Sequence, residues 1–266
     1  MPVLQMQQND RTYRKPAIYF LMVFALTVVA LLLFRQLPGL DIFVSRMAFT
    51  VEPCASDSTR AICGDFILQS NSLLNLLREI SLQIPNIFGF GIFFYLIYQI
   101  FLNRNTTAKE IGKLSLVIWT VLLSTVLLIN LILKELWGRP RPYRVEELGG
   151  EHPFVLPGTI SNYCESNCSF VSGEASSAAW LFTFLIFLPN RWHLPTGIFL
   201  SIYLVFFSGL RIAFGRHFLS DVTLSVLFTF CVMAFLNMLF STAYFRQLFE
   251  KFARWSNQVA FDLKVS

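Results

Sequence analysis

The sequence predicts an all-α integral membrane protein with six transmembrane helices in one bundle. Hydrophobic residues make up 55% of the 266 residues and charged residues 14%, which lies outside the usual range of soluble proteins. The apolar residues gather into runs of about 20 residues, the length that a helix needs to cross hydrocarbon. Basic residues concentrate in alternate connections between these runs. Because one bundle uses the whole length, we expect residues 1–266 to form a single membrane domain without a separate soluble catalytic domain.

Six apolar stretches are predicted as spans. The fourth is short, and the small residues 176–179 in its first turn indicate close packing against a neighbouring helix. Before the second span, residues 73–84 show helical apolar spacing, which predicts a helix lying flat on the outer membrane surface. After the sixth span, residues 246–266 are predicted to be an amphipathic cytoplasmic tail. The predicted spans are residues 17–34, 84–102, 114–133, 176–189, 194–212 and 221–245.

The distribution of lysine and arginine predicts the orientation. Basic residues precede the first span, join the second to the third and the fourth to the fifth, and follow the sixth. Both termini are therefore expected in the cytoplasm, and the other loops face the opposite side. The first apolar run is longer than a signal-peptide core and lacks a cleavage pattern, so we expect it to remain as an anchor. These basic residues are Arg11, Arg14, Lys15, Arg104, Lys109, Lys113, Arg191, Arg246, Lys251, Arg254 and Lys264.

Four cysteines lie in the loops assigned to the outer side. Disulfides persist in oxidising compartments such as the bacterial periplasm, and four cysteines allow three pairings. We favour the two local pairs, Cys54 with Cys63 and Cys164 with Cys168, with free thiols as the alternative. Zinc-ligand spacings are absent from the sequence, and no metal or other cofactor is predicted.

Two charged clusters, residues 134–142 and 211–221, follow apolar runs, where ionisable residues are functional candidates. They contain Lys134, Arg141 and Arg211, three cations suited to holding a phosphate. A transferring phosphoryl group spreads negative charge over its oxygens, so its catalysis depends mainly on positioning and electrostatic stabilisation. The arginine fork donates parallel hydrogen bonds to such oxygens. The clusters therefore predict a phosphoryl-transfer site with these three cations as phosphate ligands.

The second cluster also contains a candidate nucleophile. His217 can attack phosphorus if a carboxylate holds its other ring nitrogen. Asp221 lies four residues later, on the same face if the segment is helical, and is the expected holder. Arg139, Arg144 and Arg216 are either substrate contacts or ordinary interfacial arginines.

Both clusters resemble motifs of the type 2 phosphatidic-acid phosphatase (PAP2) superfamily. Residues 134–142 are similar to its Lys-x6-Arg-Pro motif, and residues 211–221 to its Arg-x5-His-x3-Asp motif. The resemblance implies a six-helix membrane phosphatase whose nucleophile, His217, forms a phosphohistidine. The family's Pro-Ser-Gly-His motif corresponds to residues 171–174, which implies that Ser172 and Gly173 donate to phosphate oxygens.

Glu174 stands where the family has the histidine that protonates the leaving group. A partly buried carboxylic acid can hold a proton and act as a general acid, which is the role we expect. An inert replacement is the alternative.

Residues 167–176, 137–142 and 40–41 resemble the bacterial lipid A 4′-phosphatase branch. That resemblance implies a Gram-negative inner-membrane enzyme whose periplasmic site removes the 4′-phosphate of lipid A. Other lipid phosphates remain alternatives: lipid A 1-phosphate, phosphatidylglycerol phosphate and undecaprenyl pyrophosphate, with hydrolysis or transfer to an acceptor lipid. A non-catalytic lipid-phosphate binder or anion transporter is a further alternative, which would not need His217 and Asp221. The expected partners are the lipid substrate and the bilayer, without nucleic acid; the sequence does not predict an oligomeric state.

Overall fold

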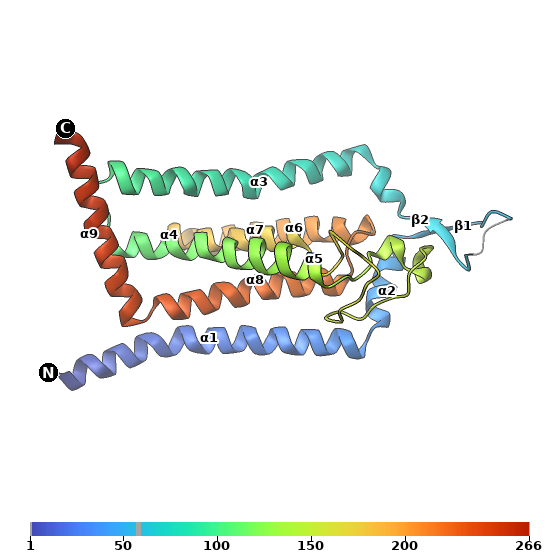
Figure 1. The fold of residues 1–266 in the computed structure, drawn as a ribbon, viewed down its shortest axis with the longest axis horizontal. Helices are drawn as coiled ribbons and strands as arrows, with labels where there is room; N and C mark the ends of the chain where they lie inside the picture. Colours follow the sequence, from blue (N-terminus) through green and yellow to red (C-terminus); the bar gives the residue numbers. More distant parts are fainter. Residues whose placement is uncertain (1, 57–59, 266) are drawn as a thin grey trace.

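The computed structural model describes residues 2–56 and 60–265, with side chains for 15–56 and 60–263. The side chains of Arg11, Arg14 and Lys264, which contributed to the predicted orientation, lie outside this set. Long helices run side by side, and one helix crosses them at the end where both termini lie (Figure 1). The opposite end carries the loops and a small hairpin (Figure 1). The prediction of a predominantly helical protein is confirmed.

Five helices in the described part of the chain are long and apolar enough to cross a membrane. The predicted fourth span is a shorter apolar helix, Gly173–Phe187. It consists of α6 (Gly173–Trp180) and a tighter 3₁₀ segment, Leu181–Phe187. The predicted count of six spans thus depends on this segment and stays a prediction. The five long helices are Lys15–Gln36, Ser72–Leu102, Ala108–Leu136, Asn190–Ala213 and Leu219–Phe240.

The first long helix leads into the outer loops. α1 (Pro2–Gln36) is followed by the short α2 (Gly39–Arg46). Strand β1 (Thr50–Glu52) then pairs antiparallel with β2 (Cys63–Asp65), with Val51 opposite Gly64. A disulfide between Cys54 and Cys63 closes this hairpin.

The second long helix corrects one sequence prediction. α3 (Ser72–Ile97) continues into a π-helical turn, Tyr98–Leu102, so the helix that contains the predicted span 84–102 begins at Ser72. The separate flat helix expected at residues 73–84 is therefore part of α3. The prediction failed because Arg78 and Glu79 lower the local hydropathy, yet Arg78 finds an ion-pair partner inside the bundle.

The third long helix carries one charged cluster at its outer end. α4 (Ala108–Thr120) begins at a capping box formed by Thr107 and Glu110. It continues through a π-helical segment, Val121–Leu133, into the turn α5 (Lys134–Leu136). This continuity places α5, which begins with Lys134, at the loop-rich end of the bundle (Figure 1).

The last two long helices flank the second cluster. α7 (Asn190–Ala213) ends just after Arg211, and α8 (Leu219–Phe240) begins just after His217. The predicted sixth span, which was expected to reach residue 245, ends at Phe240 instead. The hydroxyls of Ser241 and Thr242 donate to carbonyls of the last turn of α8.

After this break, α9 (Ala243–Val265) crosses the ends of the other helices (Figure 1). Its Phe249 and Ala253 pack on Ile111 of α4. The predicted tail is thus a helix that covers one end of the bundle.

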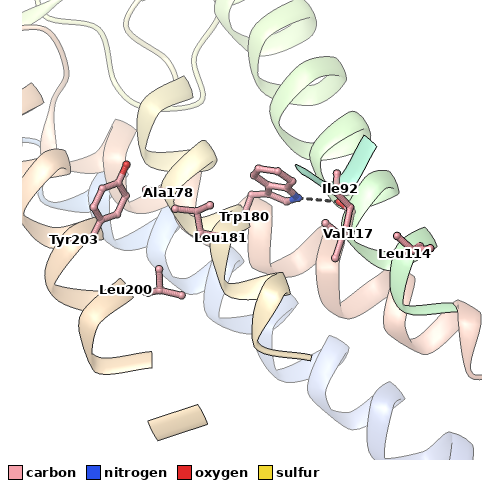
Figure 2. Close-up of a cluster of buried hydrophobic side chains, with 8 residues drawn as sticks. All are labelled: Ile92, Leu114, Val117, Ala178, Trp180, Leu181, Leu200 and Tyr203. Atoms are coloured by element: carbon pink, nitrogen blue, oxygen red, sulfur yellow. Dashed lines mark hydrogen bonds between the residues drawn. The ribbon is translucent and has the colours of Figure 1, made fainter. Parts of the chain in front are cut away.

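A buried apolar cluster holds α6 in the middle of the bundle. Trp180 packs with side chains from α3, α4 and α7, and its indole donates a 2.8 Å hydrogen bond to the Val117 carbonyl (Figure 2). The Ser176 hydroxyl lies 2.7 Å from that of Thr125 and 2.8 Å from that of Thr229. Only a small side chain permits these close approaches on both sides. The packing therefore fixes the N-terminus of α6, which carries Glu174.

Candidate active site

His217 lies in the loop between α7 and α8 and is 2% exposed. Burial lowers its pKa well below 6.5, and the positive charges of Arg211, Arg141 and Lys134 lower it further. The imidazole is therefore neutral at pH 7. These charge effects also show that the structure brings the three predicted phosphate ligands close to the predicted nucleophile.

The orientation of His217 differs from the prediction. Its Nδ1 lies 2.8 Å from the backbone carbonyl oxygen of Ser169 and makes no direct bond to Asp221. The four-residue helical spacing does not apply, because α8 begins only at Leu219. A carbonyl oxygen can only accept, so Nδ1 carries the hydrogen, and the lone pair for attack lies on Nε2.

Asp221 is fully buried and is linked to His217 only indirectly, through Ser169. Its carboxylate accepts from the Ser169 hydroxyl at 2.5 Å, the Phe218 backbone N–H at 2.9 Å and Arg139 at 2.5 Å. It therefore holds Ser169, whose carbonyl in turn holds the ring of His217.

The three cations retain donors for an anion. Within the described residues, the Lys134 ammonium makes no hydrogen bond or ion pair, and the guanidinium of Arg211 meets only Glu174, through Nε at 3.3 Å. Arg141 donates from Nε and Nη2 to the Asn167 carbonyl, at 3.1 Å and 2.7 Å. Such a concentration of incompletely neutralised cations suits a phosphate group.

Glu174 lies in the first turn of α6, between two arginines. Its Oε1 is 2.8 Å from Nη2 of Arg78 and 3.3 Å from Nε of Arg211. Arg78, on α3, was not among the predicted site residues. Its position in an apolar run was a signal that could have identified it. The Glu174 carboxylate therefore pairs with two guanidinium groups.

Gly173 is the first residue of α6, and Ser172 is its N-cap. Ser172 has no exposed surface, and its hydroxyl accepts from the Ala175 N–H at 3.4 Å, so a contact between this hydroxyl and phosphate stays a prediction. A Cβ added to Gly173 would lie 2.7 Å from Oδ1 of Asn130, another polar residue that was not predicted. The first N–H groups of a helix lack intrahelical partners and favour an anion in front of them.

Arg139 is not a substrate contact, which corrects one prediction. The side chain is fully buried, so the substrate cannot reach it. All three nitrogens of its guanidinium donate hydrogen bonds, to Asp41, Asp221, the Ser220 hydroxyl and the Val155 carbonyl. No local pattern in the sequence indicates that these charges belong together, because they come from segments far apart in the chain.

Two other arginines form a rim beside the site. Arg144 and Arg216 lie over the ring of Tyr143, at 5.6 Å and 5.0 Å from its centroid. Burial lowers the pKa of Arg141, and the charges of Arg216 and Arg144 act in the same direction. The predicted contact of Arg144 and Arg216 with substrate stays a prediction.

The loop leading into α6 is closed by a disulfide between Cys164 and Cys168. The Cys168 N–H also donates to the Lys134 carbonyl at 3.1 Å. This loop therefore connects the third long helix to the residues that hold His217. The described residues include no cluster of three or more histidine, cysteine or acidic side chains able to hold a metal ion.

Comparisons with known proteins agree with this geometry. Residues 113–245 match the family model of the PAP2 superfamily. A lipid A 4′-phosphatase of Rhizobium etli is 37% identical over 218 residues, covering 81% of this chain and 84% of the relative. The lipid A 4′-phosphatase of Rhizobium leguminosarum is 37% identical over 77% of this chain and 88% of the relative. That of Francisella tularensis subsp. novicida is 31% identical over 62% of this chain and 74% of the relative.

No solved structure matches the chain. The family match covers both charged clusters and the start of α6. Together with the relatives that align along most of its length, it shows that the protein belongs to the PAP2 superfamily.

Proposed function

We propose that the protein is a lipid A 4′-phosphatase of the Gram-negative inner membrane. The observation that carries the proposal is a neutral, buried His217 beside three incompletely neutralised cations, in a chain whose relatives bear that name. In this proposal the helix Gly173–Phe187 serves as the sixth span, both termini lie in the cytoplasm, and the site faces the periplasm. The position of both termini at the end opposite the site supports this orientation (Figure 1).

The reaction begins with attack of His217 Nε2 on phosphorus, in line with the leaving 4′-oxygen. Lys134, Arg141 and Arg211 stabilise the charge on the transferring group. The attack gives a phosphohistidine and the free sugar hydroxyl. Water then hydrolyses the phosphohistidine and releases inorganic phosphate.

Glu174 is proposed to protonate the leaving oxygen, and before substrate binds it pairs with Arg78 and Arg211. The incoming phosphate takes over donors of Arg211, and its negative charge favours protonation of the adjacent Glu174 carboxyl. In this proposal Glu174 becomes protonated in the enzyme–substrate complex, where the leaving oxygen needs a proton.

Lipid entry from the bilayer is supported by an apolar cavity of about 630 Å³ between α3, the third long helix and α6. Its lining includes Gly89 and Trp180, together with Ser177, which lies one turn along α6 from Glu174. A cavity of this character can receive an acyl chain while the phosphate reaches the cations.

The test is phosphate release by purified protein in detergent from lipid A carrying both phosphates, only the 4′-phosphate or only the 1-phosphate. We expect loss of the 4′-phosphate alone, identified by mass spectrometry, and no turnover by His217→Ala. Equal release from the 1-phosphate substrate, or faster release from phosphatidylglycerol phosphate or undecaprenyl pyrophosphate, would contradict the proposed substrate. Phosphate recovered on an acceptor lipid instead of in solution would identify a phosphotransferase.

A further inference from the structure

A buried polar cluster is linked to His217 through Ser169. Its centre is Arg139, whose Nη2 is 2.9 Å from Asp41 and whose Nη1 is 2.5 Å from Asp221. Ser220 joins the same group: its backbone N–H and hydroxyl donate to Asp41 at 2.8 Å and 2.5 Å. All four residues are 0–1% exposed. Burying so many charges is costly unless each is paired and hydrogen-bonded, as these are.

The cluster continues to the nucleophile through Ser169. Asp221 accepts from the Ser169 hydroxyl, and the Ser169 carbonyl accepts from Nδ1 of His217. The Ser169 N–H donates to the backbone carbonyl of Arg139 at 2.9 Å. A chain of hydrogen bonds therefore leads from Asp41, on α2, to the imidazole ring of His217. It passes in turn through Arg139, Asp221 and Ser169.

The charge of the cluster suits the reaction. Two carboxylates share the Arg139 guanidinium, so the cluster carries net negative charge when both are ionised. When Nε2 of His217 attacks phosphorus, the neutral imidazole becomes positively charged, and its Nδ1–H bond to Ser169 strengthens. A fixed negative charge in a water-excluded region stabilises this developing positive charge.

We propose that Asp41 is a positioning residue for phosphoryl transfer: through Arg139 it fixes Asp221 and Ser169, and so holds His217 at the angle needed for attack. The inference rests on the proposed function in that His217 is the nucleophile of that reaction. Asp41 touches no part of the substrate. Its contribution should therefore appear in kcat and leave phosphate binding unchanged.

The experiment compares Asp41→Asn and the milder Ser220→Ala with the parent. Ser220→Ala removes one hydroxyl shared by Asp41 and Arg139. The matched control is Asp65→Asn, the same change at an exposed carboxylate whose bonds are to Phe66 and Gln69. Each protein is assayed well below its own melting temperature, so that loss of folding does not contribute.

We expect kcat to fall about 10²-fold in Asp41→Asn, the usual cost of a small misplacement of reacting groups, and less in Ser220→Ala. KM and the inhibition constant of inorganic phosphate should stay at the parent values, because Lys134, Arg141 and Arg211 are unaltered. Trapped phosphohistidine should form more slowly by the same factor as kcat. Asp65→Asn should match the parent.

A double variant distinguishes an effect transmitted through the hydrogen bonds from Asp41 to Ser169 from a general loss of rigidity. If Asp41 acts through Ser169, adding Ser169→Ala to Asp41→Asn should cost less than the product of the two single effects. Parent-like kcat in folded Asp41→Asn and Ser220→Ala, raised KM with unchanged kcat, or fully multiplicative effects would overturn the inference. A parent protein that releases phosphate from no lipid would instead refute the proposed function.

Discussion

Replacing Glu174 with glutamine separates the two roles that its surroundings support. The amide keeps the size of the side chain but removes both the transferable proton and the negative charge between Arg78 and Arg211. As the proposed general acid, Glu174 should affect kcat. As the counter-ion of two arginines, Glu174 competes with phosphate for them. The glutamine variant should therefore bind phosphate more tightly, although its kcat is lower.

The magnitudes follow from the proposed chemistry and the geometry. Loss of general acid catalysis should lower kcat on lipid phosphate about 10²- to 10⁴-fold. The two ion pairs, at 2.8 Å and 3.3 Å with Glu174 22% exposed, are partly screened, so about 1 kcal/mol each is a reasonable value. Releasing Arg78 and Arg211 should then tighten binding of inorganic phosphate by about 5- to 30-fold.

The assay measures kcat with a lipid phosphate and an aryl phosphate, together with inhibition by inorganic phosphate, over a range of pH. The parent should give a bell-shaped profile, because His217 must be neutral while Glu174 must be protonated. The glutamine variant should lose the alkaline limb and recover turnover on the aryl phosphate, whose leaving group needs no proton. Parent-like turnover of lipid phosphate by Glu174→Gln would show that another residue or water donates the proton.

Four further results are expected. Activity should survive EDTA, because Lys134 and two arginines supply the positive charge; loss on chelation that magnesium restores would contradict this. Reduction of the Cys164–Cys168 disulfide should lower activity or melting temperature, since it closes the loop beside Lys134, whereas free thiols at both positions in membrane-purified protein would refute the bond. Trp180→Phe should destabilise the protein by about 0.5–1.5 kcal/mol, because it removes the indole hydrogen bond to the buried Val117 carbonyl, which keeps its bond from the Val121 N–H, and exposed Trp192→Phe should change little. The low pKa of His217 means that the unfolded chain binds more protons below about pH 6.5, so stability should fall as pH drops through that range and His217→Gln should flatten the fall; equal pH dependence of the two melting temperatures would count against it.

Sequence spacing was sufficient where the relevant contacts are local. The two charged clusters each follow an apolar run, so Lys134 and Arg211 could be assigned to one end of the bundle from the order of spans and loops alone. The pairing of Cys164 with Cys168 also follows from proximity along the chain. The amphipathic pattern after residue 245 predicted a helix, and α9 has that character.

Contacts between distant segments could not be predicted in the same way. Arg78 joins Glu174 across α3 and α6, and the hydropathy of α3 shows only that a charge interrupts an apolar run. Asp41 meets Arg139 in the interior, although the two residues lie 98 positions apart in the chain. The assumed helical spacing between His217 and Asp221 failed because α8 begins only after His217.

The crossing helix α9 has a consequence for how the chain is assembled. It is synthesised after all five long helices, yet Asn257 exchanges hydrogen bonds with the backbone of Thr106, and the Ser256 hydroxyl donates to the Gln99 carbonyl. The connection between the second and third long helices therefore gains these partners only after all five long helices have been made. Until then the backbone N–H and C=O of Thr106 lack these partners, so this turn completes its hydrogen bonding only when α9 packs across the bundle.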